Sequence, residues 1–255
     1  MKNIWAVCKK EISAYFTSPI AYVVITVFLV LVGFFFHSLI LWFNTQSMQM
    51  AKNPQMLQKL NINQMVYSPL FHNISTILLL VIPLLTMRLF AEEKKIKTDE
   101  LLFTSPLSIN QIILGKYFAS LFVLVVMLAL SGILSIFTFA YGNPELPPIL
   151  NGYLGLFLMG AAFIAVGIFF SSLTENQIVA AVLTFGALLL FWILNWASQS
   201  TGGIWQSVIN YLSFFQHFDD MTKGILDTSD LVYYLSFAFF GLFLTHSFIQ
   251  SRRWR

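Results

Sequence analysis

The sequence contains little charge and almost no cysteine. Asp, Glu, Lys and Arg make up 10% of its 255 residues, against about 25% in a soluble domain. Cys8 is the single cysteine, which excludes an intrachain disulfide and a cysteine-based metal site. The net charge of +3 is too small to indicate nucleic acid as a partner. The function must therefore be sought in the apolar segments and in the few clusters of charge.

A nucleotide-binding loop is also missing. Gly115-Lys116 is followed by Tyr117 and has no glycine in the six residues before it, whereas a P-loop has the form G-x-x-x-x-G-K-[ST]. The four histidines show no metal-ligand spacing, and no nucleophile motif accompanies them. We expect no cofactor, no metal and no enzymatic activity in this chain, so that any ATP that drives it must bind to a partner.

Methionines gather between two predicted spans, at positions 48, 50, 56 and 65. Thioethers suit Cu(I), so Met48-x-Met50 could form part of a copper site. An amphipathic segment that packs on the membrane or on a partner explains these residues more simply, and we favour it.

Acidic residues are absent from the long apolar runs. All eleven Asp and Glu lie outside the six segments that we predict to span a membrane. Ion-coupled transporters usually carry an ionisable group in the membrane, because the ion must be bound there. The clear ionisable candidate within a span is His37, for which a hydrogen-bonded histidine is the simpler interpretation. An ion-coupled secondary transporter is therefore disfavoured.

The abundant residues are apolar. Hydrophobic residues make up 58% of the chain, Phe occurs 27 times, and the mean hydropathy is +0.77. A membrane span needs about 20 apolar residues. We predict an all-α integral membrane protein with one domain, residues 1–255, and six transmembrane helices. The predicted spans are Ile20–Phe43, Ile74–Phe90, Gln111–Tyr141, Leu150–Ser172, Ile178–Ala197 and Leu231–Gln250.

Two further segments are predicted to lie at the membrane surface. Residues 1–18 are too interrupted by charge for a signal peptide and form an interfacial helix instead. Its lipid-facing residues are Trp5, Ile12, Tyr15 and Phe16, with Lys9 and Lys10 at the headgroups. Within the outer segment 198–230, Gly202–Phe218 is predicted to be re-entrant or interfacial. A seventh span there is disfavoured because its length is marginal.

The basic residues indicate an orientation. With both termini in the cytoplasm, eleven of the fourteen Lys and Arg fall on the inner side, in agreement with the positive-inside rule. The outer side then holds Lys52, Lys59 and Lys223. Ser108-x-x-Gln111 and Thr174-x-x-Gln177 fit the capping box, so each predicts a helix start just before an apolar run.

The fourth span is rich in Gly and Ala, and Ala161-x-x-x-Ala165 would allow close helix packing. Packing within the subunit is the default interpretation, and a dimer interface is the alternative.

The densest charge cluster lies in the sequence RLFAEEKKIKTDELLFTSPLSINQIILGK, Arg88 to Lys116. It resembles the permease subunits of type-2 ABC transporters, in which the loop after the second span carries R-x-F/L-A-E-E-K/R, then T-x-E-L-L-x-T-x-P-x-S and a later G-K. The segments KKEISAYFTSPIAYVV and FFSSLTENQIVAAVLTF extend the resemblance over most of the chain. Within the family, the chain resembles the gliding-motility permeases of the GldF type. One departure is Ile96-Lys97, where relatives often have Gly.

The resemblance implies a membrane-spanning permease, here of the export kind, in the bacterial inner membrane. It implies two kinds of partner besides lipid: a separate cytoplasmic ABC ATPase dimer and a second permease, identical or different. Residues 91–110 would form the coupling segment that contacts the ATPase. The expected ATPase-coupling residues are Glu92, Glu93, Lys94, Thr98, Glu100, Leu101, Leu102, Pro106, Thr174, Glu175 and Gln177.

Two other classes of function stay open. The chain could be a non-transporting membrane anchor that assembles a motility or secretion complex, or, with less support, an ion-coupled transporter. An ATPase gene beside this one would favour the transporter over the anchor. Neither substrate nor direction is readable from the sequence.

Overall fold

The computed structural model describes residues 2–50, 61–98, 107–142, 144–198, 211 and 213–253. Within these ranges the chain is helical and contains no strand. The helices are α1 (Lys2–Thr17), α2 (Pro19–Met50), the π-helical turn η1 (Asn63–Tyr67), α4 (Ser68–Thr86), α5 (Arg88–Lys95), α7 (Ile109–Tyr141), α8 (Leu146–Leu173), α9 (Gln177–Ser198), α11 (Phe214–Thr222) and α12 (Thr228–Arg253).

Six helical stretches in the described ranges are long and apolar enough to cross a membrane. They confirm the predicted all-α membrane class and its six spans. The second span differs most from its prediction, because it starts at Asn63 rather than Ile74 and runs to Lys95. Its polar hydroxyl groups are satisfied within the helix, since Ser75 and Thr76 donate to the His72 carbonyl at 2.7 and 3.0 Å.

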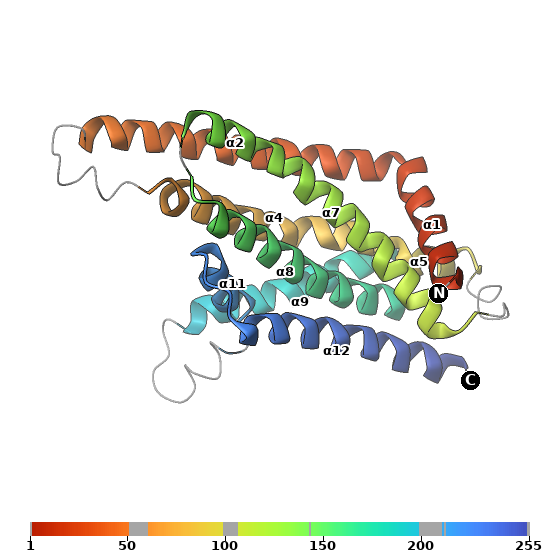
Figure 1. Ribbon diagram of the computed structural model, residues 1–255. Helices are drawn as coiled ribbons and strands as arrows, with labels where there is room; N and C mark the ends of the chain where they lie inside the picture. Colours follow the sequence, from red (N-terminus) through yellow and green to blue (C-terminus); the bar gives the residue numbers. More distant parts are fainter. Residues whose placement is uncertain are drawn as a thin grey trace.

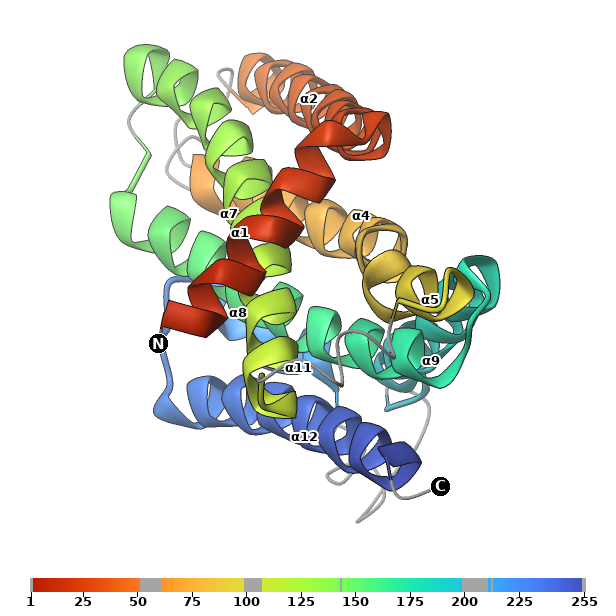
Figure 2. The same ribbon diagram turned by 90° about the vertical axis from the view of Figure 1, so that its right-hand side faces the viewer.

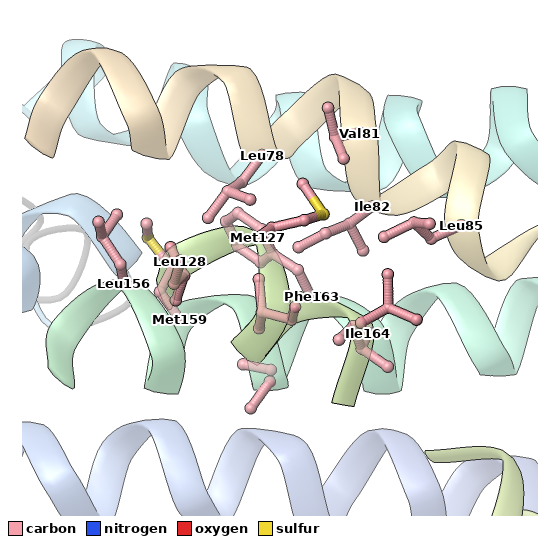
Figure 3. Close-up of a cluster of buried hydrophobic side chains, with 14 of the residues drawn as sticks. Leu78, Val81, Ile82, Leu85, Met127, Leu128, Leu156, Met159, Phe163 and Ile164 are labelled. Atoms are coloured by element: carbon pink, nitrogen blue, oxygen red, sulfur yellow. The ribbon is translucent and has the colours of Figure 1, made fainter. Parts of the chain in front are cut away.

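The bundle has two central helices and four outer ones. In the apolar windows of the second span and of α8, 72% and 78% of the residues are buried, against 17% to 39% in the other four spans. Figure 1 shows α4 and α8 running side by side within the bundle. Figure 3 shows their contact, where Leu78 and Ile82 of α4 meet Phe163 of α8 and Met127 of α7. The outer helices present apolar surface, as expected for helices that face lipid.

Glycines in α8 permit this close packing. A Cβ at Gly152 would clash with the Phe71 ring, and one at Gly167 would clash with the Thr86 side chain, both on α4. The small residues of the fourth span therefore serve contacts inside the subunit, which was the default interpretation of the sequence.

The two ends of the bundle are unlike. The chain termini and α5 lie at one end in Figure 1, and α11 lies at the other. In Figure 2, which views the bundle from the end with the termini, α1 crosses α7, its main packing partner. Both termini at the same end require an even number of spans, which agrees with six.

A buried histidine fixes α11 at the far end. His217 Nδ1 lies 2.6 Å from Asp230 Oδ1 on α12, and Nε2 lies 3.0 Å from the Tyr211 carbonyl. Both ring nitrogens of His217 therefore have a polar partner, and the contact with Asp230 joins α11 to α12. Most of the predicted re-entrant stretch Gly202–Phe218 lies outside the described residues, and its described end forms the start of α11.

The two predicted helix starts had different outcomes. Ser108 forms the full capping box with Gln111 at the start of α7. The box at Thr174 was wrong: Thr174 Oγ1 accepts from the Asn176 N–H at 3.1 Å, and Asn176 Oδ1 accepts from Ile178 N–H at 2.9 Å. Asn176, a strong cap residue in its own right, thus begins α9.

Candidate functional site

The charged coupling segment begins inside a helix that follows directly from the second span. Pro83 lies within α4, and the helix is interrupted at Met87 before it continues as α5. Ser171 of α8 fills this break. Its hydroxyl accepts from the backbone N–H groups of Phe90 and Ala91, at 3.0 and 3.2 Å, and donates to the Met87 carbonyl at 2.9 Å. The end of α8 thereby holds the start of α5 in place.

Lys116 of α7 is a buried cation at the centre of the site. Its side chain is 1% exposed, and Nζ lies 2.9 Å from both Glu11 Oε1 and Glu93 Oε2. Nζ also donates to the Leu89 carbonyl at 2.6 Å and lies 5.0 Å from the centre of the Phe90 ring. A buried ammonium needs partners of this kind to offset its desolvation. Lys116 therefore links α1, α5 and α7.

Glu93 is shared between two lysines. Its Oε1 lies 3.2 Å from Lys10 Nζ, its Oε2 faces Lys116, and its side chain is 13% exposed. Two consecutive residues of α1 thus form ion pairs with two different helices, Lys10 with Glu93 of α5 and Glu11 with Lys116 of α7. The four charges, two of each sign, cancel within the cluster formed by Lys10, Glu11, Glu93 and Lys116, which we call the α5 junction.

Lys94 is directed toward α8 and α12. Its ammonium donates to the Ser172 carbonyl in the last turn of α8 and lies 5.5 Å from the centre of the Phe248 ring. A cation at a helix C-terminus is favoured by the free carbonyls and the helix dipole. Lys94 is buried, so both Glu93 and Lys94 stabilise the position of α5 within the subunit.

Glu92 and Lys95 lie on the exposed side of α5. The Glu92 side chain is 48% exposed, and its Oε2 lies 3.8 Å from Arg88 Nε one turn earlier. The Arg88 guanidinium in turn lies 5.0 Å from the centre of the Tyr15 ring. An exposed i,i+4 pair of this length contributes little to stability, which leaves the Glu92 carboxylate available to a partner.

The end of α5 shows why relatives often have glycine there. Lys97 has φ +57°, its N–H donates to the Lys94 carbonyl at 3.1 Å, and the Thr98 N–H donates to the Glu93 carbonyl at 2.9 Å. These bonds form a Schellman motif, whose left-handed residue is usually Gly. At the departure Ile96-Lys97, the turn is therefore formed with a lysine in the left-handed conformation.

Tyr15 corrects the predicted face of α1. The sequence placed it in lipid, but it is 2% exposed, and its hydroxyl donates to the Leu85 carbonyl at 2.8 Å and contacts Ser120 Oγ at 3.2 Å. Burial, the largest cause, raises the pKa of Tyr15 far above its ordinary value. The face of α1 that packs on α4 and α7 thus carries a neutral tyrosine next to the α5 junction.

A family comparison now decides what kind of protein carries this site. The model of the ABC-2 family transporter protein matches residues 5–248, almost the whole chain. The chain belongs to the ABC-2 transporter family. A comparison with curated proteins finds no significant match. Members of the ABC-2 family are the membrane permeases of ABC transporters and work with a separate ATPase subunit.

The ATPase-coupling residues expected of this permease lie in three parts of the chain: α5 and the turn that ends it, residues outside the described ranges, and the turn between α8 and α9. Glu92 is exposed, Thr98 is half-buried at the end of the Schellman turn, and Glu93 and Lys94 face inward. Glu100, Leu101, Leu102 and Pro106 lie outside the described residues. Between α8 and α9, Glu175 is exposed, whereas Thr174 and Gln177 are half-buried. Thr174 follows Ser172, the acceptor of Lys94, by two residues, so this turn and α5 occupy the same end of the bundle.

The sequence interpretation missed the buried residues of the permease that fix the position of α5 within the bundle. Lys116 was counted as an inner charge, and Glu11 was given no partner. Ser171 was given no hydrogen-bonding role, since it stood only for close helix packing, in Gly167-x-x-x-Ser171, and within the stretch FFSSLTENQIVAAVLTF that resembles the family. A usable signal was present for Lys116, because it lies seven positions after Ile109, the first residue of a strongly apolar helix. A lysine at that position calls for a carboxylate from a neighbouring element.

The described residues contain no group of three His, Cys, Asp or Glu that could hold a metal ion. Met48 is exposed at the end of α2, Met65 is half-buried in η1, and Met56 lies outside the described residues. The favoured amphipathic segment and the alternative copper site at these methionines both stay untested.

Proposed function

We propose that this permease transmits the motion of a cytoplasmic ABC ATPase dimer to its spans through α5, and that it works in export. The observation that carries this proposal is the α5 junction, together with the Ser171 and Lys94 contacts to α8. A segment bound to α1, α7 and α8 at once cannot shift without moving them. Packed elements with discrete contacts transmit displacement in this way.

The proposed orientation puts α5, both termini and the turn at residues 174–177 in the cytoplasm of a bacterial inner membrane. Support comes from the positive-inside bias of the sequence and from the position of the termini beside α5. The exposed residues Glu92 and Glu175 would then meet the ATPase, with Leu101 and Leu102 filling its groove. Closure of the ATPase dimer on ATP would push residues 91–110, tilt the spans, and open a path at the contact between two permeases.

The placement among gliding-motility permeases is a finer part of the proposal. It rests on the resemblance of residues 9–24, 88–116 and 169–185 to that group. A non-transporting anchor of a motility complex would use the same docking surface but would need no tight link between α5 and the spans. The α5 junction therefore favours the transporter.

Neighbouring glutamates on α5 provide a sharp test. Glu92→Lys should reduce co-purification of the cognate ATPase about tenfold or more, since reversal of an interfacial charge costs a few kcal/mol when the pair is desolvated, while the thermal stability of the isolated permease should stay unchanged. Glu93→Lys should lower that stability, because it places a third ammonium beside Lys10 and Lys116. If Glu92→Lys leaves ATPase binding and transport intact, α5 is not the docking surface.

The apolar part of the segment is tested by Leu101→Asp. A charge in an apolar contact cannot be desolvated cheaply, so this variant should insert in the membrane, release the ATPase and abolish transport. Glu145→Lys is the matched control, because Glu145 is exposed at the start of α8, at the end away from α5. Unchanged co-purification of Leu101→Asp with the ATPase would move the docking site to another contact, such as residues 174–177.

A further inference from the structure

A groove between α1 and α7 is lined by apolar residues and one lysine. From α1 it takes Trp5, Cys8, Lys9 and Ile12 among others, and from α7 it takes Phe118 and Phe122. Its volume of ≈ 570 Å³ lies within the range of small-molecule sites, about 300–1,000 Å³. The groove is separate from the α5 junction, which uses the opposite face of α1.

The groove continues into an apolar strip along α7. Phe118, Phe122 and Val125 are all exposed, and their spacing of four and three residues places them on one helical face. Trp5, at the groove's edge on α1, is 67% exposed. Tryptophan is favoured at the membrane interface, where its amphipathic ring meets the headgroups. The groove thus leads from an interfacial residue to the lipid-facing surface of a span.

The charge at this edge is positive. Lys2 and Lys9 flank Trp5 at spacings of three and four residues, so the three share one face of α1. Lys9 lines the groove and forms no ion pair with any described residue, whereas its neighbour Lys10 pairs with Glu93. An unpaired cation beside this apolar groove complements a lipid that has an anionic headgroup and an acyl chain.

We propose that this groove binds one anionic phospholipid, with an acyl chain between α1 and α7 and its phosphate at Lys9. The charge distinguishes this groove from a second one between α7 and α12, which has a volume of ≈ 400 Å³ and is lined by Ile113, Phe239 and His246 among others. Among the described residues, the lining of that second groove contains no lysine or arginine. It should take lipid without preference for a charged headgroup and serves as the internal control.

Quenching of tryptophan by brominated lipid tests the proposal in vesicles. The full-length permease would keep Trp5 alone, with the five other tryptophans replaced by phenylalanine. Brominated phosphatidylglycerol should compete for Trp5 about fivefold better than brominated phosphatidylcholine, as expected for one lysine near an anionic headgroup. A tryptophan-free chain carrying Phe239→Trp should be quenched about equally by both lipids.

Two lysine variants complete the experiment. Lys9→Gln should abolish the preference for phosphatidylglycerol at Trp5, whereas Lys95→Gln, an exposed lysine on α5, should leave it unchanged. Equal quenching of Trp5 by the two lipids would overturn the proposal, because the contact would be ordinary annular lipid. A preference for phosphatidylglycerol that survives Lys9→Gln would also overturn the proposal. Quenching of Trp5 that appears only when the protein is diluted in the bilayer would overturn it as well, because a second copy of the chain would then occupy the groove at higher protein density.

Discussion

Lys116 shows how a single residue organises the cytoplasm-facing end proposed for this permease. It is buried in an apolar helix, and its charge is tolerable only because Glu11, Glu93 and the Leu89 carbonyl converge on it from two other elements. Burial of an ion pair is weak evidence for net stabilisation, but loss of one partner leaves the other charge uncompensated. The residue therefore specifies the arrangement of α1, α5 and α7 more than it adds to the free energy of folding.

A double-mutant cycle checks this at the residue scale. Lys116→Met should lower the free energy of unfolding in detergent by about 3–5 kcal/mol, because two carboxylates lose their buried partner. Glu11→Gln in the Lys116→Met background should cost less than in the wild type, with a coupling energy of about 1–3 kcal/mol. Lys95→Met, at an exposed position on α5, should change stability by less than about 0.5 kcal/mol. Additive effects of Lys116→Met and Glu11→Gln would contradict the ion pair.

At the scale of the element, α5 is a short helix that owes its position to its two ends. At its start the N–H groups of Phe90 and Ala91 donate to the Ser171 hydroxyl, and its last turn ends in a Schellman motif. An eight-residue helix is marginal alone, so these contacts with α8 and with its own last turn decide its direction.

Lys97→Gly should stabilise the protein. Lys97 has φ +57°, and a non-glycine residue in this left-handed conformation costs about 1–2 kcal/mol. Glycine has a larger conformational entropy in the unfolded chain, which offsets part of this cost. We therefore expect the free energy of unfolding to rise by about 0.5–1 kcal/mol, visible as a higher Tm in detergent. Lys95→Gly, at the last helical residue, should lower the Tm instead. Equal effects of the two substitutions would show that Lys97 is not strained.

Ser171→Ala is the second prediction for α5. It leaves the Phe90 and Ala91 N–H groups without their buried acceptor, which costs about 1–3 kcal/mol. Faster amide hydrogen exchange at Phe90 and Ala91, with little change in the middle of α7, would be the measurable sign. Exchange that rises equally throughout the bundle would point to general destabilisation rather than to release of α5.

At the scale of the whole molecule, the bundle places both termini, α5 and the turn at residues 174–177 together. This arrangement allows one partner to contact all of them from one side of the membrane. The contacts at this end are charged and directional, whereas those in the middle of the bundle are apolar, so displacement at the end can be passed along rigid helices.

Accessibility of single cysteines tests the orientation. In a chain with Cys8 replaced by Ser, an impermeant thiol reagent applied from outside should label cysteines introduced at positions 52 and 223 but not at position 95. Outside labelling at position 95 would reverse the proposed topology. In the wild type, burial, followed by the nearby Glu11, raises the pKa of the Cys8 thiol, so the native cysteine should react slowly near neutral pH.

ATP hydrolysis tests the division of labour in the transporter. The purified permease alone should show no ATPase activity, since its sequence has no P-loop, and turnover should appear when the cognate ATPase is added. Hydrolysis by a preparation shown to be free of the ATPase would contradict this.

The sequence by itself determined the class of the protein, its six apolar helices, the start of α7 at Ser108 and the membership of residues 5–248 in the ABC-2 family. These features follow from local composition and from short-range capping bonds, which can be read along the chain. Only the tertiary structure decided that Glu93 and Lys94 face inward, that Tyr15 is buried within the protein rather than exposed to lipid, and that Lys116 contacts two other helices. Those contacts link residues up to 105 positions apart, and the direction of a side chain on a short helix depends on which neighbour packs against it, which the local pattern does not encode.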